Sequence, residues 1–199
     1  MSRRVPLLLA VLIALAGARG ARAADTGAID GTISAAVAKN RVNAVVYVKE
    51  GNLGPRKPAE AVMDQRGLVF VPRVLPIQTG STVLFLNSDP TGHNVYSIDG
   101  EKYDLGTWPA GEKRPHQFTK PGVYRQLCHV HDDMIAFVVV VDTSFFALSD
   151  KAGHFRLEGL PAGDYVLGVW HEKLAADDLH VTVTAGGTVT VDVPLKSRK

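Results

Sequence analysis

The chain has 199 residues, a single cysteine, and 22 basic against 20 acidic residues, which gives a formal net charge of +2. This length suits one or two small domains with apolar cores, and a single cysteine excludes an intramolecular disulfide. The basic residues do not cluster, so the sequence predicts no nucleic-acid interface.

The first 23 residues are predicted to be a signal peptide that is removed on export. Arg3 and Arg4 precede an apolar run over residues 5–16, and a small-x-small cleavage site follows at 21–23. The residues after the paired arginines fit a twin-arginine signal poorly, which favours general secretion. The apolar run is short for an anchor and no second one follows, so we expect no membrane span in the mature chain. Loss of the four leader arginines leaves 18 basic and 20 acidic residues, a net charge of −2, in a protein expected in the periplasm.

After the leader, short β-branched and aromatic runs separated by Gly, Pro, Asn and Asp predict an all-β protein. The thirteen expected strands cover residues 29–34, 43–49, 68–71, 82–86, 94–97, 116–119, 123–127, 136–141, 145–148, 154–157, 165–171, 179–184 and 188–195. This number exceeds what one small sandwich needs, so we expect two sandwiches.

Two breaks divide these strands, a Gly/Pro-rich loop at residues 51–58 and a short break at 142–144. We expect residues 25–58 and 145–199 to form one seven-stranded sandwich into which a second domain, residues 60–142, is inserted. The plainer alternative gives the first two strands to the second domain and leaves a five-stranded tail. Such a tail would expose sheet edges that need covering, which favours the insertion.

Four residues in the 60–142 segment have the types and spacing of a copper site. His93 follows an apolar strand and a loop, whereas Cys128, His131 and Met134 lie together just before an apolar run. A thiolate, two imidazoles and a thioether at longer distance form the ligand set of type 1 copper. Each residue alone has a plainer interpretation, such as an inert core thiol or apolar filler. Their combination in this order favours copper ligation.

The segment resembles the cupredoxins over roughly residues 60–142. The resemblance is carried by residues 68–72, 80–87, 93–95 and 121–124, and by a Cys-x2-His-x2-Met spacing similar to that of amicyanin. It implies a Greek-key sandwich holding one type 1 copper ion through His93, Cys128, His131 and Met134. It also implies that the backbone N–H of Asn94 points at the Cys128 sulfur. Leu127 and Gln126 depart from the family pattern, because a tyrosine and an apolar residue are usual at these positions.

The flanking strands resemble a second family. Residues 149–155 and 160–165, two turns around one strand, are similar to the carboxypeptidase-regulatory-like β-sandwich. Residues 31–33 and 43–48 are similar to the first two strands of the same module. The resemblance implies a seven-stranded sandwich, and no catalytic motif is found in it.

The expected function is that of an exported blue copper protein, not an enzyme, which carries single electrons between redox partners. A c-type cytochrome or a periplasmic dehydrogenase would be such a partner. A copper oxidase or nitrite reductase would need a further His-rich centre, which the sequence does not offer. The alternative is a periplasmic protein for copper storage or delivery, although Met- or His-rich tracts are absent. A zinc site and a Cys–His hydrolase are disfavoured, by the thioether and by the lack of an oxyanion-hole signature respectively.

Other polar residues lie near the motif in the sequence. His129 alternates with the ligands and is expected to face solvent, and His171 has no assigned role. Asp132 and Asp133 follow His131 directly. Together with Asp89 and Asp99 at the same end, they predict an acidic surface that attracts a positively charged partner.

Overall fold

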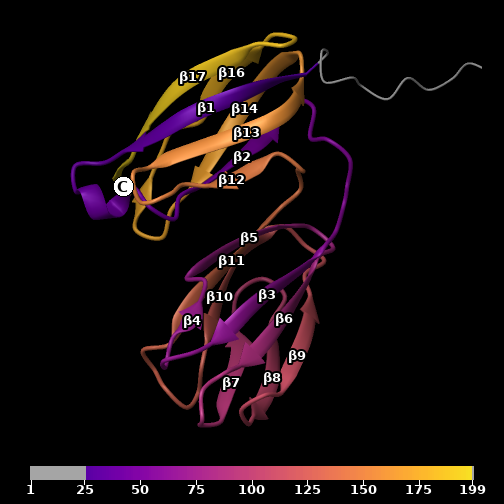
Figure 1. Ribbon diagram of the computed structural model, residues 1–199, viewed down its shortest axis with the longest axis vertical. Coiled ribbons are helices and arrows are strands. Elements are labelled where there is room, and N and C mark those ends of the chain that lie inside the picture. The colour runs from indigo at the N-terminus through magenta and orange to yellow at the C-terminus, as the bar shows by residue number, and fades with distance from the viewer. Residues whose placement is uncertain (1–25, 199) are drawn as a thin grey trace, which may run out of the picture.

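The computed structural model describes residues 26–198, and the expected leader at residues 1–23 lies outside them. The described chain is all-β, with eighteen strands and a short 3-10 turn, η2, at Ala38–Asn40. The strands form two sandwiches that follow one another along the long axis of the molecule (Figure 1). Within residues 26–198, no helix has the length and hydrophobicity needed to cross a membrane.

The outer sandwich contains both ends of the described chain. One of its sheets has the order β13-β1-β17, and the other has the order β12-β2-β14-β15-β18 with β16 also paired to β14. The strands are β1 Thr26–Ser34, β2 Val45–Glu50, β12 Phe146–Leu148, β13 His154–Pro161, β14 Gly163–Trp170, β15 Leu174–Ala175, β16 Leu179–Val183, β17 Thr188–Pro194 and β18 Lys196–Ser197. Alternate residues of these strands point inward, so that Ile29, Ile33 and Leu157 share one core.

The inner sandwich is formed by the strands between β2 and β12. Its sheets have the orders β5-β11-β10-β7-β8 and β4-β3-β6-β9. The strands are β3 Glu60–Gln65, β4 Phe70–Val71, β5 Val74–Gln78, β6 Thr82–Asn87, β7 His93–Ser97, β8 Tyr103–Trp108, β9 Lys113–Gln117, β10 Gly122–Leu127 and β11 Ile135–Val141. Phe85, Trp108 and Val138 are fully or almost fully buried in a second core between these sheets.

The pairing of the first strands is relevant to the two arrangements that the sequence left open. β1 lies parallel to β17 and antiparallel to β13, and β2 pairs with β12 and β14. The first two strands therefore pair with strands that follow residue 145. Among the described strands, β3 to β11 pair only with one another. On this pairing we propose that the inner sandwich is inserted into the outer one, with crossings near residues 58–60 and 142–145.

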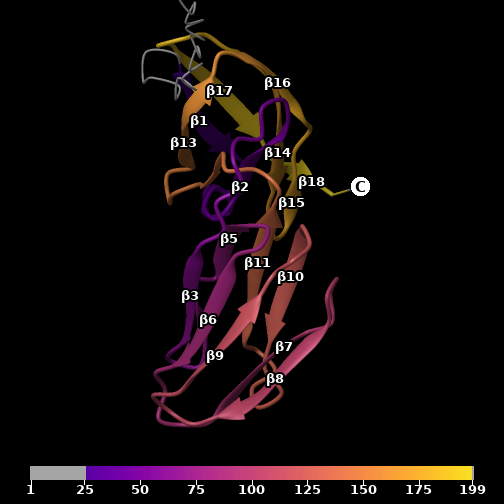
Figure 2. The same ribbon diagram turned by 90° about the vertical axis from the view of Figure 1, so that its right-hand side faces the viewer.

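Strand β11 is buried on both faces, which explains its continuous apolar sequence. Ala136, Val138 and Val140 point into the inner core. Phe137, Val139 and Val141 point the other way, into a cluster that joins the two sandwiches. In Figure 2, the arrow of β11 ends beside the outer sandwich. Because successive side chains of a strand alternate between faces, a strand covered on both sides needs an apolar residue at every position.

Polar contacts reinforce this junction beside β11. Arg73 forms a salt bridge of 2.6 Å with Glu172 of the outer sandwich, and its guanidinium lies 5.6 Å from the centre of the Phe137 ring. Trp170 of β14 packs against the same ring at 5.1 Å. The contacts link the two sandwiches through side chains of both, so the outer sandwich is held against the sheet that carries β11.

Candidate metal centre

Strand pairing brings the predicted copper ligands to one end of the inner sandwich. His93 is the first residue of β7, and the segment from Cys128 to Met134 connects β10 to β11. β10 pairs with β11 from Gly122 to Leu127 and with β7 through Leu127 and Tyr96. The connecting segment therefore lies beside the start of β7, at the end of the sheet away from the outer sandwich (Figure 1).

Three of the four predicted ligands converge. The Nδ1 atom of His93 lies 3.9 Å from the Cys128 Sγ and 3.2 Å from the Nδ1 of His131. One donor atom of each residue lies within 4.8 Å of the others. His93 is fully buried and Cys128 is 3% exposed, whereas His131 is half-buried. The cluster is thus reached from solvent at its His131 side.

The donor set has the chemistry and the close spacing of a copper site. Metal–nitrogen bonds of about 2.0 Å and metal–sulfur bonds of about 2.3 Å place donors of one ion within about 4.3 Å of each other. The separations of 3.2 and 3.9 Å meet this condition. A soft thiolate combined with two imidazoles is a donor combination that suits copper.

Met134 is buried next to this cluster. It is 1% exposed and belongs to the same apolar core as Cys128. Its backbone N–H donates to the carbonyl of His131 at 3.1 Å, which closes a tight turn between the two residues. The position of Met134 at the entry of β11 is therefore fixed by both the turn and the core, and its role as an axial ligand remains a proposal.

Asp89, predicted from the sequence to be a surface carboxylate, is buried and contacts His93 instead. Asp89 Oδ2 lies 2.9 Å from His93 Nε2, and Asp89 is only 6% exposed. Its two oxygens also accept the backbone N–H groups of Gly67 at 2.6 Å and Leu68 at 2.9 Å. Burial raises the pKa of Asp89, but these hydrogen bonds and that of His93 outweigh burial and hold the pKa below its ordinary value. The carboxylate is therefore ionised, and it fixes the orientation of the His93 ring.

The turn that binds Asp89 has an unusual backbone. Gly67 and Leu68 both have positive φ, 68° and 60°, and the Arg66 N–H donates to the Val69 carbonyl at 3.0 Å. Two positive φ angles in succession are typical of a type I′ hairpin turn, which here joins β3 to β4. A leucine in this left-handed conformation carries a backbone strain energy of about 1–3 kcal/mol. The two hydrogen bonds to Asp89 offset part of that cost.

Asn94 contacts the cysteine sulfur in the manner that the cupredoxin resemblance implies. Its backbone N–H lies 3.5 Å from Cys128 Sγ. Its side-chain amide donates to Asp104 Oδ1 at 2.7 Å and to the Gly106 carbonyl at 3.0 Å. The backbone of Asn94 is thereby held in place by strand β8, next to the thiolate.

His129 faces away from the cluster. Its ring stacks on Tyr96 with 3.8 Å between the ring centres and 8° between the planes, and Nε2 lies 3.3 Å from Asp104 Oδ2. The His129 side chain is 58% exposed. It therefore lies on the surface beside Cys128.

Two of the four predicted surface acids are not available to a partner, which corrects the expected acidic surface. Asp89 is buried, as described above, and Asp99 forms hydrogen bonds of 2.9 Å with the guanidinium of Arg125. Asp132 and Asp133 are exposed, and no hydrogen bond or ion pair of their carboxylates is seen within residues 26–198. The acidic pair beside His131 is what remains of the predicted surface.

The structure also accounts for two residues that were unusual in the sequence. Gln126 is fully buried, but its side-chain NH2 donates to the Tyr124 carbonyl at 3.0 Å and its side-chain oxygen accepts the Tyr103 hydroxyl. A polar residue therefore fits this inward position.

The second residue is His171, whose ring accepts the backbone N–H groups of Lys173 and Leu174 at 3.2 and 3.1 Å. Burial lowers the pKa of His171, which suits a neutral acceptor that closes the turn after β14.

Family models confirm both resemblances inferred from the sequence. Residues 58–141 match the copper binding proteins of the plastocyanin/azurin family, and residues 135–196 match the carboxypeptidase regulatory-like domain. The two matches overlap at residues 135–141, and pairing with β5 and β10 assigns these residues to the inner sandwich. No significant match was found among curated protein sequences.

Solved structures resemble part of the chain. A copper-containing nitrite reductase from Thermus scotoductus is 27% identical over 47% of this chain and 25% of its own, with a TM-score of 0.40. A purple cupredoxin from Nitrosopumilus maritimus is 26% identical over 41% of this chain and 99% of its own, with a TM-score of 0.38. An amicyanin variant in the Cu(I) state is 23% identical over 41% and 82%, with a TM-score of 0.39. This chain thus spans about a quarter of the nitrite reductase. The TM-scores are low, so the function of these proteins is not transferred to this chain.

Proposed function

Because residues 58–141 match the copper-binding plastocyanin/azurin family, we propose that this chain is a type 1 copper protein that carries single electrons between redox partners. The observation that supports the proposal most directly is the convergence of His93, Cys128 and His131 at one end of the inner sandwich. Met134 is proposed as the axial ligand. A bound copper ion would supply a one-electron couple between Cu(II) and Cu(I).

The side chains around the site are suited to hold such a centre with little rearrangement. His93 is fixed by Asp89, and Cys128 receives the N–H of Asn94. Both ligands are buried among strands of a packed sandwich, so water is excluded on that side. His131 is half-buried at the edge of the centre, and we propose it as the point where electrons enter and leave.

Copper stoichiometry together with the visible spectrum tests the proposal. The purified chain, loaded with Cu(II), is expected to hold one copper ion and to absorb strongly in the visible. Ascorbate should bleach this band and ferricyanide should restore it. A pale protein that binds several copper ions would support storage or delivery instead. Two or more copper ions combined with nitrite consumption would support an enzyme.

We also propose that the protein acts in the periplasm after removal of residues 1–23. The supporting feature is the basic, apolar and small-residue pattern of that segment. The N-terminal sequence of the exported protein tests this, because cleavage after residue 23 would leave Ala24 first. Retention of residues 1–23 on protein recovered from the periplasm would contradict it.

The acidic pair beside His131 is expected to steer a positively charged partner, such as the lysine-ringed haem edge of a c-type cytochrome. The rate of electron transfer to cytochrome c should fall as ionic strength rises, because salt screens the attraction. Replacing both Asp132→Asn and Asp133→Asn should flatten this dependence and leave the visible spectrum unchanged. Stopped-flow kinetics at several salt concentrations measures the effect.

A double variant with two charges removed elsewhere is the matched control. Glu50 lies on β2 of the outer sandwich and Glu60 begins β3, at the end of the inner sandwich opposite to the cluster. Both are exposed. Glu50→Gln with Glu60→Gln should keep the wild-type salt dependence. A rate that rises with salt, or equal behaviour of the two double variants, would favour an apolar docking face around His131.

A further inference from the structure

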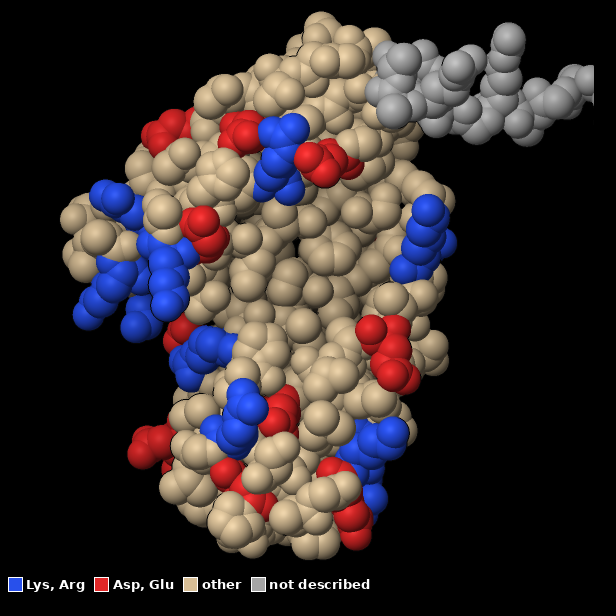
Figure 3. Space-filling model, in the orientation of Figure 1, with Lys and Arg blue, Asp and Glu red and all other residues tan. Residues whose placement is uncertain are grey.

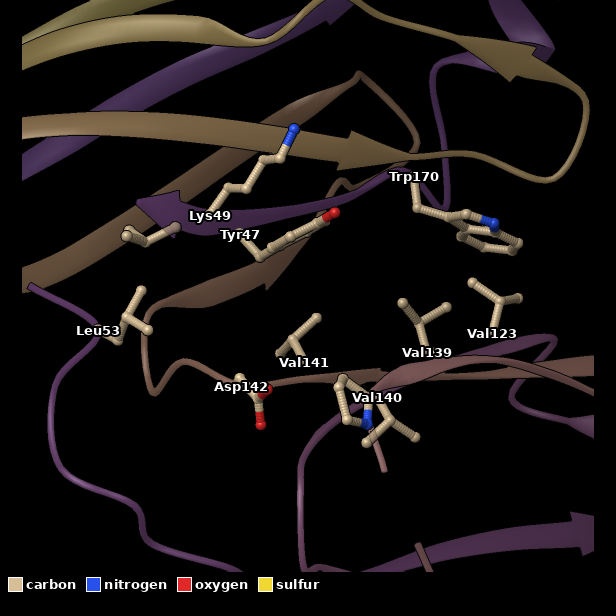
Figure 4. A pocket seen from close by; sticks show the side chains of 12 residues that line it. Tyr47, Lys49, Leu53, Val123, Val139, Val140, Val141, Asp142 and Trp170 are labelled. Carbon is tan, nitrogen blue, oxygen red and sulfur yellow. The ribbon is translucent and has the colours of Figure 1, made fainter. Parts of the chain in front are cut away.

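A groove between the two sandwiches lies well apart from the copper ligands. It consists of two neighbouring cavities of about 340 and 520 Å³, and both are lined by Val123 and Trp170. In Figure 4, Tyr47 and Trp170 project from β2 and β14 toward Val123, Val139 and Val141 on the facing sheet. Residues of both sandwiches therefore make the walls. Junctions between domains are a common place for ligand sites of this size.

The smaller cavity is apolar, and its charged residues already have partners. Its walls are mainly valine, leucine and aromatic side chains. Of the two charged residues that line it, Lys49 forms an ion pair with Asp178 at 2.5 Å and Asp142 forms one with Arg56 at 3.3 Å. This half of the groove thus offers apolar surface without a free charge, which suits a hydrocarbon or aromatic group.

The larger cavity differs, because its positive charges exceed its negative ones. Its two carboxylates, Asp99 and Glu172, are paired with Arg125 and Arg73 respectively. Lys173 and Arg198 also line it.

Within residues 26–198, neither of the last two cations forms an ion pair with a carboxylate. Arg198 donates to the carbonyls of His171 and Leu174, and the Lys173 side chain has no ion pair within residues 26–198. Figure 3 shows a different face of the molecule, on which Lys and Arg side chains gather at one edge of the outer sandwich. In the groove itself, the lining residues give one apolar cavity beside one that carries more cations than carboxylates. An apolar half therefore continues into a cationic half.

We propose that this groove binds an amphipathic anion, a long-chain carboxylate, with its tail under Trp170 and its head at Lys173 and Arg198. The tail would cover Tyr47, Val123 and Trp170, which are only half-buried in the structure. The head would supply the negative charge that the two cations lack. The proposal does not depend on copper, because none of the copper ligands lines the groove.

Calorimetric titration of the full chain with laurate, below its micelle concentration, tests the proposal. We expect saturable binding of one laurate per chain, accompanied by a change in tryptophan fluorescence. Of the two tryptophans, Trp108 is buried in the inner core and Trp170 lines the groove, so the change should come from Trp170. Dodecyltrimethylammonium, which has the same tail and the opposite charge, should bind at least about tenfold more weakly.

Two charge reversals separate a specific head site from general attraction. Lys173→Glu should weaken laurate binding by about tenfold. Lys151→Glu, which changes an exposed lysine on the turn before β13, should leave it unchanged. Lys173 is exposed, so its substitution should leave the fold intact. An unchanged visible spectrum of the copper-loaded variant would verify this. Absence of saturable binding, equal affinity for the cationic amphiphile, or equal effects of the two reversals would each overturn the proposal.

Discussion

Replacing Cys128 with serine is expected to abolish the visible absorption band and to weaken Cu(II) binding by more than about 100-fold. Loss of a group that only orients a ligand typically costs 10–100-fold in metal affinity, and loss of the soft thiolate itself should cost more. A serine hydroxyl stays protonated and is a harder donor. Absorption spectroscopy and a Cu(II) competition assay measure the two effects. Circular dichroism checks the fold, because the substitution buries a hydroxyl in an apolar core, where it costs about 1–3 kcal/mol.

His129→Ala is the matched control for this substitution. His129 is bonded to Cys128 in the chain, but its ring stacks on Tyr96 and is largely exposed. Its removal should leave the copper content and the visible band unchanged. A band that survives Cys128→Ser, or one that disappears with His129→Ala, would contradict the proposed donor set.

The sequence predicted the fold class and the convergence of the donors because both depend on local patterns. Short apolar runs between turn residues identified most long strands, and His93, Cys128 and His131 lie at strand ends that pairing brings together. The expectation that the flanking segments form one sandwich came from a strand count and from their resemblance to one family, and β1 pairs with β17 of the C-terminal segment.

Strands whose pattern is set by distant neighbours were missed. β3 is mostly exposed at its start and carries only a few apolar residues, and β5 contains Pro76. β8 alternates weakly, and its one buried residue is Trp108. β3, β5 and β8 are stabilised by pairing with β6, β11 and β7, respectively. Short windows of sequence do not reveal such pairing.

The region at residues 68–71 was predicted as a strand and is instead a hairpin turn followed by a short strand. Leu68 has a positive φ, which a β-branched or apolar pattern does not indicate. The conformation is explained by the amides of the turn, which bind Asp89. Because Asp89 lies more than twenty residues away in the chain, the turn and the buried carboxylate could only be recognised together in the structure.

The role of Asp89 leads to the second large expected effect. Asp89→Asn keeps the size of the side chain but removes its charge, and it replaces one accepting oxygen by a donating NH2 group. The backbone N–H groups of Gly67 and Leu68 and the Nε2 of His93 all face these oxygens. One of these donors is therefore left without an acceptor in a buried site. We expect the free energy of unfolding of the inner sandwich to fall by about 1–3 kcal/mol.

The same substitution is expected to change the redox properties of the centre. A carboxylate that accepts the N–H of a metal-bound imidazole makes the imidazole a stronger donor, and this favours the more highly charged Cu(II) over Cu(I). Asp89→Asn should therefore weaken Cu(II) binding by about 10–100-fold, weaken Cu(I) binding less, and raise the reduction potential. Asp64→Asn on β3 is the control, because it removes a charge from the same hairpin, where one carboxylate oxygen has no hydrogen-bond partner. It should leave the potential unchanged. If Asp89→Asn lowered stability while the potential and both copper affinities stayed at wild-type values, Asp89 would act only to close the β3–β4 turn.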